Sequence, residues 1–374
     1  MGDLGNVMMN RRIFKDETSE TGEIPFYKIG TFGSTPDAYI TREKFDKYKA
    51  KYPYPKIGDI LLAASGATIG KTIEFDGEDS YFQDSNIVWL EHDERLTASF
   101  LKQFYSLVSW RGLEGTAVPR LYNKIILETD ISIPSPNEQV AIGNLFRIFD
   151  TALTLHKRKL MKLKELKKGY LQMMFPQCGE NVPRLRFKGF TGDWQNKKAG
   201  EIFISVSDKN HPMLSVLSAS QEKGMILRDE IGIDIKYDEN ALGTYKKIMP
   251  GQFAIHLRSF QGGFAHSTIE GITSPAYTIL DFENQNEHDS GFWKEIFTSS
   301  IFIKRLETIT YGIRDGRSIS FSEFSTLDLT SPTKKEQIAI ANFFRTLDRS
   351  IVAQQAGLDK LKQLKQAYLQ KMFV

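Results

Sequence analysis

One stretch of the sequence is close to a nucleotide-binding loop. Residues 65–72 read Ser-Gly-Ala-Thr-Ile-Gly-Lys-Thr, whereas a P-loop requires Gly-x-x-x-x-Gly-Lys-Ser/Thr, because glycine amides wrap the phosphates at the start of a helix. Serine replaces the first glycine here, and residues 73–77 are typical of a strand and turn. We therefore favour a glycine-rich hairpin that presents Ser65, Thr68 and Lys71 to phosphate groups. ATP binding through Lys71 is the alternative.

Other patterns that could support catalysis or metal binding are weak. The six histidines show no zinc-ligand spacing, and the single cysteine, Cys178, can form neither an internal disulfide nor a structural zinc site. The nuclease-like pattern Glu165-Leu-Lys167 lies in a lysine-rich stretch that is typical of a helix surface. We therefore predict no catalytic residue, no metal and no cofactor for this chain.

Length and composition favour two globular domains. The chain has 374 residues, of which 41% are hydrophobic and 25% charged, and this is enough for two ordinary cores. Its mean hydropathy is -0.33, and its apolar runs are too short to span a membrane. The N-terminus lacks the pattern of a secretory signal. We expect a cytoplasmic protein that does not enter a membrane.

The sequence repeats itself at an offset of 198 residues. Residues 134–175 align without a gap to residues 332–373, and about twenty of these forty-two positions are identical. The intervening residues share little beyond weak similarities such as Gly58-Asp59 with Gly251-Gln252. The repeat predicts two variable modules that alternate with two fixed segments, in the order 1–132, 133–180, 181–330 and 331–374.

The fixed segments are predicted to be helical. Apolar residues at helical spacing, such as Ile142 and Phe146, define one face, and a second helical stretch with Leu160 and Tyr170 follows. Two such segments in one chain favour an antiparallel coiled coil, with docking of each on its own module as the alternative. The basic run at residues 156–168 is typical of the solvated face of such a helix, although it could also attract phosphates.

The variable modules are predicted to be mixed and rich in β-structure. Short apolar or alternating runs bounded by Gly, Asp or Ser indicate strands, and two longer amphipathic stretches indicate helices. The fold class is therefore α+β, with two β-rich modules, two long antiparallel helical segments and a pseudo-twofold internal repeat. The strand candidates are residues 60–63, 86–90, 253–257 and 277–280, and the helix candidates are residues 98–110 and 292–308.

Three motifs resemble those of the specificity subunits of type I restriction-modification enzymes. They are Pro-x-x-x-Glu-Gln-x-Ala-Ile and Leu-Lys-x-Leu-Lys-x-x-Tyr-Leu-Gln-x-Met-Phe, each present twice, and a lead-in at residues 185–194, Leu-Arg-Phe-x-x-Phe-x-x-x-Trp. The resemblance covers essentially the whole chain. It implies two target recognition domains, each reading half of a split DNA site, with helices between them. A second lead-in is expected before Gly2, so we expect the first module to be shortened.

The resemblance also implies the partners. They would be double-stranded DNA, two modification (methyltransferase) subunits and, through the complex, restriction subunits. The chain itself would be non-catalytic, since it lacks the Asp/Asn-Pro-Pro-Tyr/Phe motif of adenine methyltransferases. Four apolar residues repeat too faithfully for a solvent-exposed face and are predicted to bind the modification subunit, with burial in each module's own core as the alternative: Ile142, Phe146, Ile340 and Phe344.

Candidate DNA contacts are polar residues in glycine-rich or aromatic loops, because phosphate contacts position a protein and base edges specify the sequence. Both modules are net acidic, so binding would require a local basic face. The alternatives are that these loops are solvated turns, or that the modules bind protein and the chain is an adaptor. Beyond the hairpin, the candidates are Arg120, Tyr122, Asn123 and Lys124 in the first module, and Arg258, Ser259, Gln261, Arg314, Arg317 and Ser318 in the second.

Overall fold

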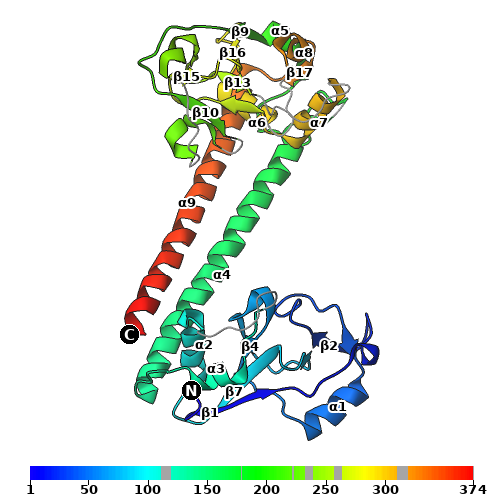
Figure 1. The fold of residues 1–374 in the computed structure, drawn as a ribbon. Helices are drawn as coiled ribbons and strands as arrows, with labels where there is room; N and C mark the ends of the chain where they lie inside the picture. The colour runs from blue at the N-terminus through cyan, green and yellow to red at the C-terminus, as the bar shows by residue number, and fades with distance from the viewer. Residues whose placement is uncertain are drawn as a thin grey trace. The chain divides into compact units, whose positions relative to one another are not determined.

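The computed structural model describes residues 1–110, 119–177, 179–220, 223–231, 239–256, 263–309 and 319–373. The chain forms two compact units. Unit 1 comprises Met1–Lys157 and Ala356–Val374, and unit 2 comprises Arg158–Gln355. Each unit joins one variable module to parts of two long helices (Figure 1). The mixture of helices and sheets confirms the predicted α+β class.

The two long helices are continuous. Helix α4 spans Pro136–Met173 and helix α9 spans Lys334–Met372. Each was predicted as two successive helical stretches, but no proline interrupts either one after its start, and the two stretches therefore join into one helix. Pro136 is the first residue of α4, where its fixed φ suits the helix and its missing N–H is no loss.

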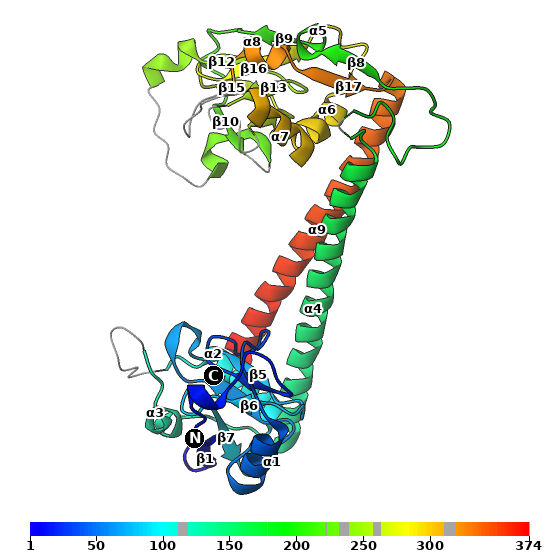
Figure 2. The same cartoon turned by 90° about the vertical axis from the view of Figure 1, so that its right-hand side faces the viewer.

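In unit 1 the start of α4 packs against the end of α9 (Figure 2). The Lys365 Nζ donates to Asp150 Oδ1 at 2.6 Å. The rings of Phe146 and Phe373 lie with their centroids 6.4 Å apart. Residue numbers fall along α9 as they rise along α4, so the two segments run antiparallel.

Unit 2 contains the repeat-related arrangement. Lys167 Nζ donates to Asp348 Oδ1, also at 2.6 Å, and both residues lie 198 positions from their counterparts in unit 1. The Tyr170 and Phe343 rings meet edge to face, with centroids 4.9 Å apart. The end of α4 therefore runs antiparallel to the start of α9 in unit 2, as the corresponding segments do in unit 1, which confirms the predicted antiparallel pairing.

The two modules are built around sheets of the same order. Unit 1 has the antiparallel order β1-β7-β4-β5, and unit 2 has β9-β16-β13-β14 in the corresponding positions. Similar topology thus arises from dissimilar sequences. The strands of unit 1 are β1 (Gly5–Met9), β7 (Ile87–His92), β4 (Ile60–Ala63) and β5 (Thr72–Glu74), and those of unit 2 are β9 (Phe203–Val206), β16 (Thr278–Phe282), β13 (Phe253–Ile255) and β14 (Phe264–His266).

Smaller elements complete each unit. Unit 1 adds a three-stranded sheet of β3 (Tyr39–Ile40), β2 (Ile24–Tyr27) and β6 (Tyr81–Phe82), helices α1 (Arg42–Lys51), α2 (Ala98–Leu107) and α3 (Asn123–Glu128), and the 3-10 turns Lys15–Glu17 and Gly66–Thr68. Unit 2 adds the strand pairs β10 (Leu217–Ser220) with β11 (Gly224–Leu227), β12 (Lys246–Ile248) with β15 (Gly271–Thr273), and β8 (Gln195–Lys198) with β17 (Asp328–Ser331). It also contains α5 (Ala199–Ile202), α6 (Ser290–Phe297), α7 (Ser300–Ile309), α8 (Phe321–Ser325) and the 3-10 turns Arg228–Ile231 and Glu239–Thr244.

The weak sequence similarity at Gly58 and Gly251 marks equivalent turns. Both glycines adopt positive φ, 92° and 93° respectively, which a residue with a Cβ rarely does. In each turn the side chain of the residue after the glycine accepts a hydrogen bond from the backbone N–H three residues earlier. Asp59 accepts from the Lys56 N–H and Gln252 from the Met249 N–H, both at 2.8 Å. Each turn leads into a central strand, β4 or β13. The shared turn therefore positions the same strand in both units.

A buried glutamine attaches each module to its long helix. Gln139 is fully buried, and its Oε1 accepts from the Thr97 N–H at 2.8 Å, just before α2. Its Nε2 donates to the carbonyls of Arg95 and Pro134, at 2.8 and 2.9 Å. Gln337 makes the corresponding three bonds in unit 2, including one from the Asp289 N–H at 2.9 Å. This explains why both copies of the repeat contain the glutamine.

We expect the Gln139→Ala variant to lose about 2 kcal/mol of stability, because the Thr97 amide and two carbonyls lose their partner. Chemical denaturation of the full chain, followed by circular dichroism, measures the loss. The matched control is Gln370→Ala on the exposed surface of α9, which should change stability by less than about 0.5 kcal/mol. Equal effects of the two substitutions would show that the hydrogen bonds of Gln139 do not stabilise the fold.

Candidate nucleic-acid interface

The P-loop-like residues form a β-hairpin. β5 follows the turn and pairs antiparallel with β4, with Ile60 opposite Glu74. The Lys71 Nζ donates to the carbonyl of Phe32 and lies 6.0 Å from the centre of its ring. A P-loop requires a helix after its lysine and a lysine that reaches the phosphates. The segment is therefore a β-hairpin and not a P-loop, which disfavours the ATP-binding alternative. That this hairpin presents Ser65, Thr68 and Lys71 to phosphate groups stays a prediction.

A polar cluster lies where this hairpin turns. Ser65 Oγ donates to Asn86 Oδ1 at 2.6 Å. Arg120 Nη2 lies 3.3 Å from both Asn86 Oδ1 and Ser85 Oγ. Ser65, Ser85, Asn86 and Arg120 are named the Arg120 cluster below. Ser65 is buried and Arg120 is half-buried, so the cluster holds the arginine side chain in place while part of it stays accessible.

Backbone contacts bring these distant residues together. Ser65 and Arg120 form an isolated antiparallel bridge, supported by a hydrogen bond from the Leu121 N–H to the Ala64 carbonyl at 2.8 Å. Ser85 adopts a positive φ of 53°, which is uncommon for a residue other than glycine. The turn before β7 thereby directs Ser85 and Asn86 to the end of β4.

Ser85 and Asn86 did not appear among the sequence candidates. The signal that could have indicated them is the Asp84-Ser85-Asn86 run, since Asp, Ser and Asn are typical turn residues. That run marks a turn, but it does not say which other loop the turn meets.

The remaining candidates of unit 1 differ in accessibility. Tyr122 is 45% exposed and directly precedes α3. Lys124 is exposed, with its Nζ 3.7 Å from Glu128 Oε1. Thr68 and Asn123 are half-buried. An exposed aromatic ring and a cation thus follow Arg120 closely in the chain, and a guanidinium, a lysine and an aromatic ring can contact phosphates and bases.

The candidates of unit 2 lie outside the described residues. They are Arg258, Ser259, Gln261, Arg314, Arg317 and Ser318. Residues 257–262 connect β13 to β14, the strands that correspond to β4 and β5. They therefore occupy the same place in the chain connectivity as the hairpin of unit 1.

The four predicted partner-binding residues lie in the cores of their own units. Ile142 is 8% exposed and Phe146 is fully buried, both in the core of unit 1. Ile340 is 2% exposed and Phe344 is fully buried, both in the core of unit 2. Side chains that are at most 8% exposed cannot form a docking face, so this prediction is corrected to the alternative of a core role.

The basic run on α4 lies mostly in solvent. Lys157, Arg158, Lys159, Lys162 and Lys164 are all exposed. Its half-buried member, Lys167, lies 3.1 Å from the buried Glu295 and 2.6 Å from Asp348. These exposures agree with the solvated-face interpretation of the run.

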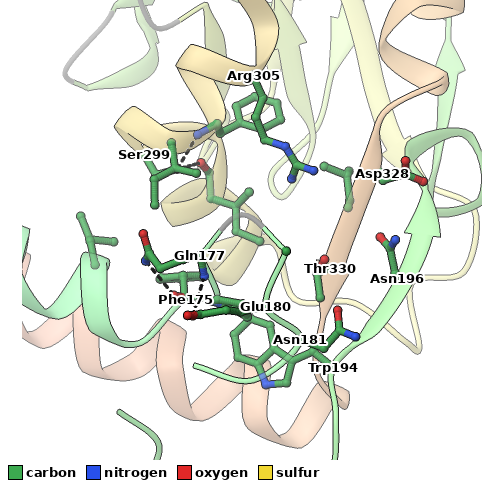
Figure 3. Close-up of a pocket in the computed structure, with 17 residues that line it drawn as sticks. Phe175, Gln177, Glu180, Asn181, Trp194, Asn196, Ser299, Arg305, Asp328 and Thr330 are labelled. Carbon is green, nitrogen blue, oxygen red and sulfur yellow. Dashed lines mark hydrogen bonds between the residues drawn. The ribbon is translucent and has the colours of Figure 1, made fainter. Parts of the chain in front are cut away.

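A cavity of about 280 Å³ lies in unit 2 (Figure 3). Phe175 and Trp194 line it together with polar side chains from β8, β17 and α7, among them Asn196, Asp328 and Arg305. None of the sequence-predicted site residues that the structure describes lines this cavity.

Among the described residues there is no group of three His, Cys, Asp or Glu side chains suited to a metal ion. The described helices include none that is both long and apolar enough to cross a bilayer.

Known proteins resemble this chain in sequence. Residues 1–165 match the family described as Type I restriction modification DNA specificity domain. A protein of Haemophilus influenzae named as a type I restriction enzyme specificity subunit is 53% identical over 152 residues. This region makes up 40% of the present chain and 39% of that protein. The match thus covers well under half of the relative.

Solved structures share the fold. The S subunit of a type I restriction-modification system from M. genitalium aligns with a TM-score of 0.60 at 15% identity, over 100% of this chain and 94% of that one. A chain from a study of assembly and conformational transition of the type I R-M system gives 0.53 at 14% identity, over 100% and 96%. Together with the family match, these findings confirm the resemblance to type I specificity subunits.

Proposed function

We propose that the chain is the non-catalytic, DNA-reading subunit of a type I restriction-modification complex. Each unit would read one half of a bipartite target in double-stranded DNA. The chain would position two modification subunits and, through them, restriction subunits. The observation that carries this proposal is that the sheet order and the glutamine hydrogen bonds repeat in the two units, whereas the sequences of the two modules differ.

The chemistry of the Arg120 cluster supports DNA binding in unit 1. A guanidinium held by Asn86 and Ser85 is partly ordered before it meets a base, which lowers the entropy cost of binding. Lys124 is exposed and can contact phosphate, and the Tyr122 ring is available for stacking or hydrogen bonding. Arg120 and Lys124 thus place two cations close together in the chain of a module that is net acidic.

Exchange of one module tests the proposal. Residues 203–330 would be replaced by the equivalent module of a relative, and the methylated motif would be read by methylome sequencing in cells that supply the modification subunit. We expect one half of the motif to change and the other to persist, because base contacts arise within each unit. Alteration of both halves would contradict independent reading.

A mobility shift with random bipartite duplexes tests the adaptor alternative. Binding without sequence preference would favour an adaptor.

Arg120→Ala is expected to weaken binding to the cognate duplex by about 1 to 3 kcal/mol and to relax one position of the motif. Competition mobility shifts against single-base variants of the duplex provide the measurement. The control is Arg42→Ala on α1, where the guanidinium pairs with Asp79 outside the Arg120 cluster. If Arg120→Ala keeps both the affinity and the motif while the fold is intact, the cluster is a structural turn.

A further inference from the structure

One side of helix α1 in unit 1 is basic and lies outside the Arg120 cluster. Lys44, Lys47 and Lys51 are spaced by three and four residues, so their side chains lie along one side of the helix. Tyr48 and Tyr52 have the same spacing and lie beside these lysines. Lys47 and Lys51 are exposed, whereas Lys44 and the two tyrosines are half-buried. Cations thus alternate with aromatic rings along this side of α1.

A neighbouring segment adds a further cation. Residues 11–17 run alongside the same side of α1 in the antiparallel direction. At the end of the helix, the Arg11 guanidinium lies 5.6 Å from the centre of the Tyr52 ring. At its start, the Lys44 Nζ donates to Glu17 Oε1. Arg11 is exposed. The side chains that form this surface are named the α1 face: Arg11, Lys44, Lys47, Tyr48, Lys51 and Tyr52.

The aromatic rings hold the cations of the α1 face in place. The Lys51 Nζ lies 5.5 Å from the centre of the Tyr52 ring, which therefore contacts both Lys51 and Arg11. The Lys44 Nζ lies 5.6 Å from the centre of the Tyr48 ring. The two tyrosine rings meet edge to face at 5.3 Å. Cation–π contacts do not neutralise a positive charge, so these cations can still bind an anion.

The charges of the α1 face differ from those on another side of the helix. There, Arg42 and Lys49 both pair with Asp79. Within the described part of the chain, the three exposed cations of the α1 face form no ion pair with a carboxylate. Like charges that lie close together repel one another, and a bound anion relieves this repulsion. The face therefore suits a partner that presents several negative charges in a row.

The segment beside α1 also connects this face to the Arg120 cluster. The Arg12 Nε donates to Asp84 Oδ2 at 2.7 Å. Asp84 directly precedes Ser85, which belongs to the cluster, and Arg11 directly precedes Arg12. One elongated polyanion could therefore contact the cluster and the α1 face together.

We propose that the α1 face binds the phosphate backbone of duplex DNA beside the half-site that unit 1 reads, independently of the base sequence. Lys44 to Lys51 span about 10 Å of helix, a length over which one DNA strand presents about three phosphates. Lysine binds phosphate as a point charge, and the release of counterions from the DNA favours binding. The inference rests on the proposed function, because it requires that unit 1 meets duplex DNA, and it adds a contact outside the bases that are read.

The salt dependence of DNA binding tests this inference. The variant that carries Lys47→Gln and Lys51→Gln loses two charges of the α1 face, and fluorescence anisotropy measures its affinity for a duplex with the methylated motif over a series of salt concentrations. We expect the slope of log affinity against log salt to become shallower by about 2, because each lost phosphate contact removes about 0.9. At low salt the affinity should fall on the order of tenfold. The same loss is expected for a duplex with scrambled half-sites, and the motif should stay unchanged.

Two control variants separate the position of the charges from their number. Lys28→Gln with Lys56→Gln removes two lysines of unit 1 that pair with Asp37 and Glu91, and this variant should keep nearly the full slope. Lys47→Arg with Lys51→Arg retains both charges and should bind like the unsubstituted chain.

The outcomes distinguish this inference from the proposed function. An unchanged slope in the Lys47→Gln, Lys51→Gln variant, with motif selection intact, would overturn the α1 face and leave the proposed function standing. A changed motif would assign these lysines to base reading, and loss of the modification subunit at an unchanged slope would assign them to a protein partner; either result would overturn the inference. A shallower slope in a chain that shows no sequence preference would support the α1 face and contradict the proposed function. Absence of DNA binding would overturn both.

Discussion

Glu336→Ala is expected to lower the free energy of unfolding of unit 2 by about 3 to 5 kcal/mol. The Glu336 side chain is 1% exposed and that of its partner Arg186 is 15% exposed. Removal of the carboxylate leaves the half-buried Arg186 guanidinium without its counter-charge and loses two charge-assisted hydrogen bonds. It also removes the ion pair that fastens the lead-in, residues 185–194, to α9. Urea denaturation followed by tryptophan fluorescence reports on unit 2 when Trp89 and Trp110 of unit 1 are replaced by phenylalanine in every chain compared, because Trp194 and Trp293 are buried in unit 2.

The repeat provides a matched control for this prediction. Glu138 occupies the equivalent position in unit 1 but is exposed, so Glu138→Ala should change stability by less than about 0.5 kcal/mol. Equal losses at the two positions would show that the ion pair is not the source of the effect. A double variant that also carries Arg186→Ala should recover part of the loss, since it removes the unpaired charge.

Unit 2 is expected to lose about 4 kcal/mol of stability between pH 7.5 and pH 5. Burial lowers the pKa of both His266 and His288 from 6.5 to about 4. Above pH 6.5 both rings are neutral in the folded and unfolded states and contribute no pH dependence. As the pH falls from 6.5 to 4, only the unfolded chain takes up the protons, and stability is lost by about 1.4 kcal/mol per pH unit for each ring. Below pH 4 the loss levels off.

The packing around these rings accounts for the lowered pKa. His288 stacks on Phe282 with centroids 5.3 Å apart, and His266 lies 5.0 Å from the ring of Phe253. Denaturation at a series of pH values measures the effect, and NMR titration of the imidazoles reports each pKa. Replacement of both histidines by asparagine should flatten the pH dependence between pH 6.5 and 4. An unchanged slope in that variant would assign the acid sensitivity to other groups.

The pairing of the two long helices could be predicted from the sequence because their segments repeat. Two near-identical amphipathic stretches in one chain predicted the antiparallel pairing, whereas the ion pairs of Asp150 with Lys365 and of Asp348 with Lys167 emerged only from the structure. The pattern could not show what covers an apolar face. Phe146 and Phe344 were assigned to a partner for that reason, although each module covers its own phenylalanine.

The candidate site was only partly predictable. Ser65 and Arg120 were recognised from glycine-rich and basic loops, and the structure brings them into contact. Asn86 and Ser85 were missed, because they reach the cluster from the turn before another strand and no local pattern encodes that meeting. Whether Arg258 and Arg317 form a corresponding cluster stays a prediction.

The glutamine anchor has an evolutionary consequence. Gln139 and Gln337 hold their modules through main-chain groups: the amide of Thr97 and the carbonyl of Arg95 in one unit, and the amide of Asp289 and the carbonyl of Glu287 in the other. The carbonyl is the same for every amino acid and the N–H is present in all but proline, so this attachment places little demand on the sequence of the module. Recombination could therefore replace a whole module in one event while the helices stay unchanged, and the protein could acquire a new binding preference without first losing its fold.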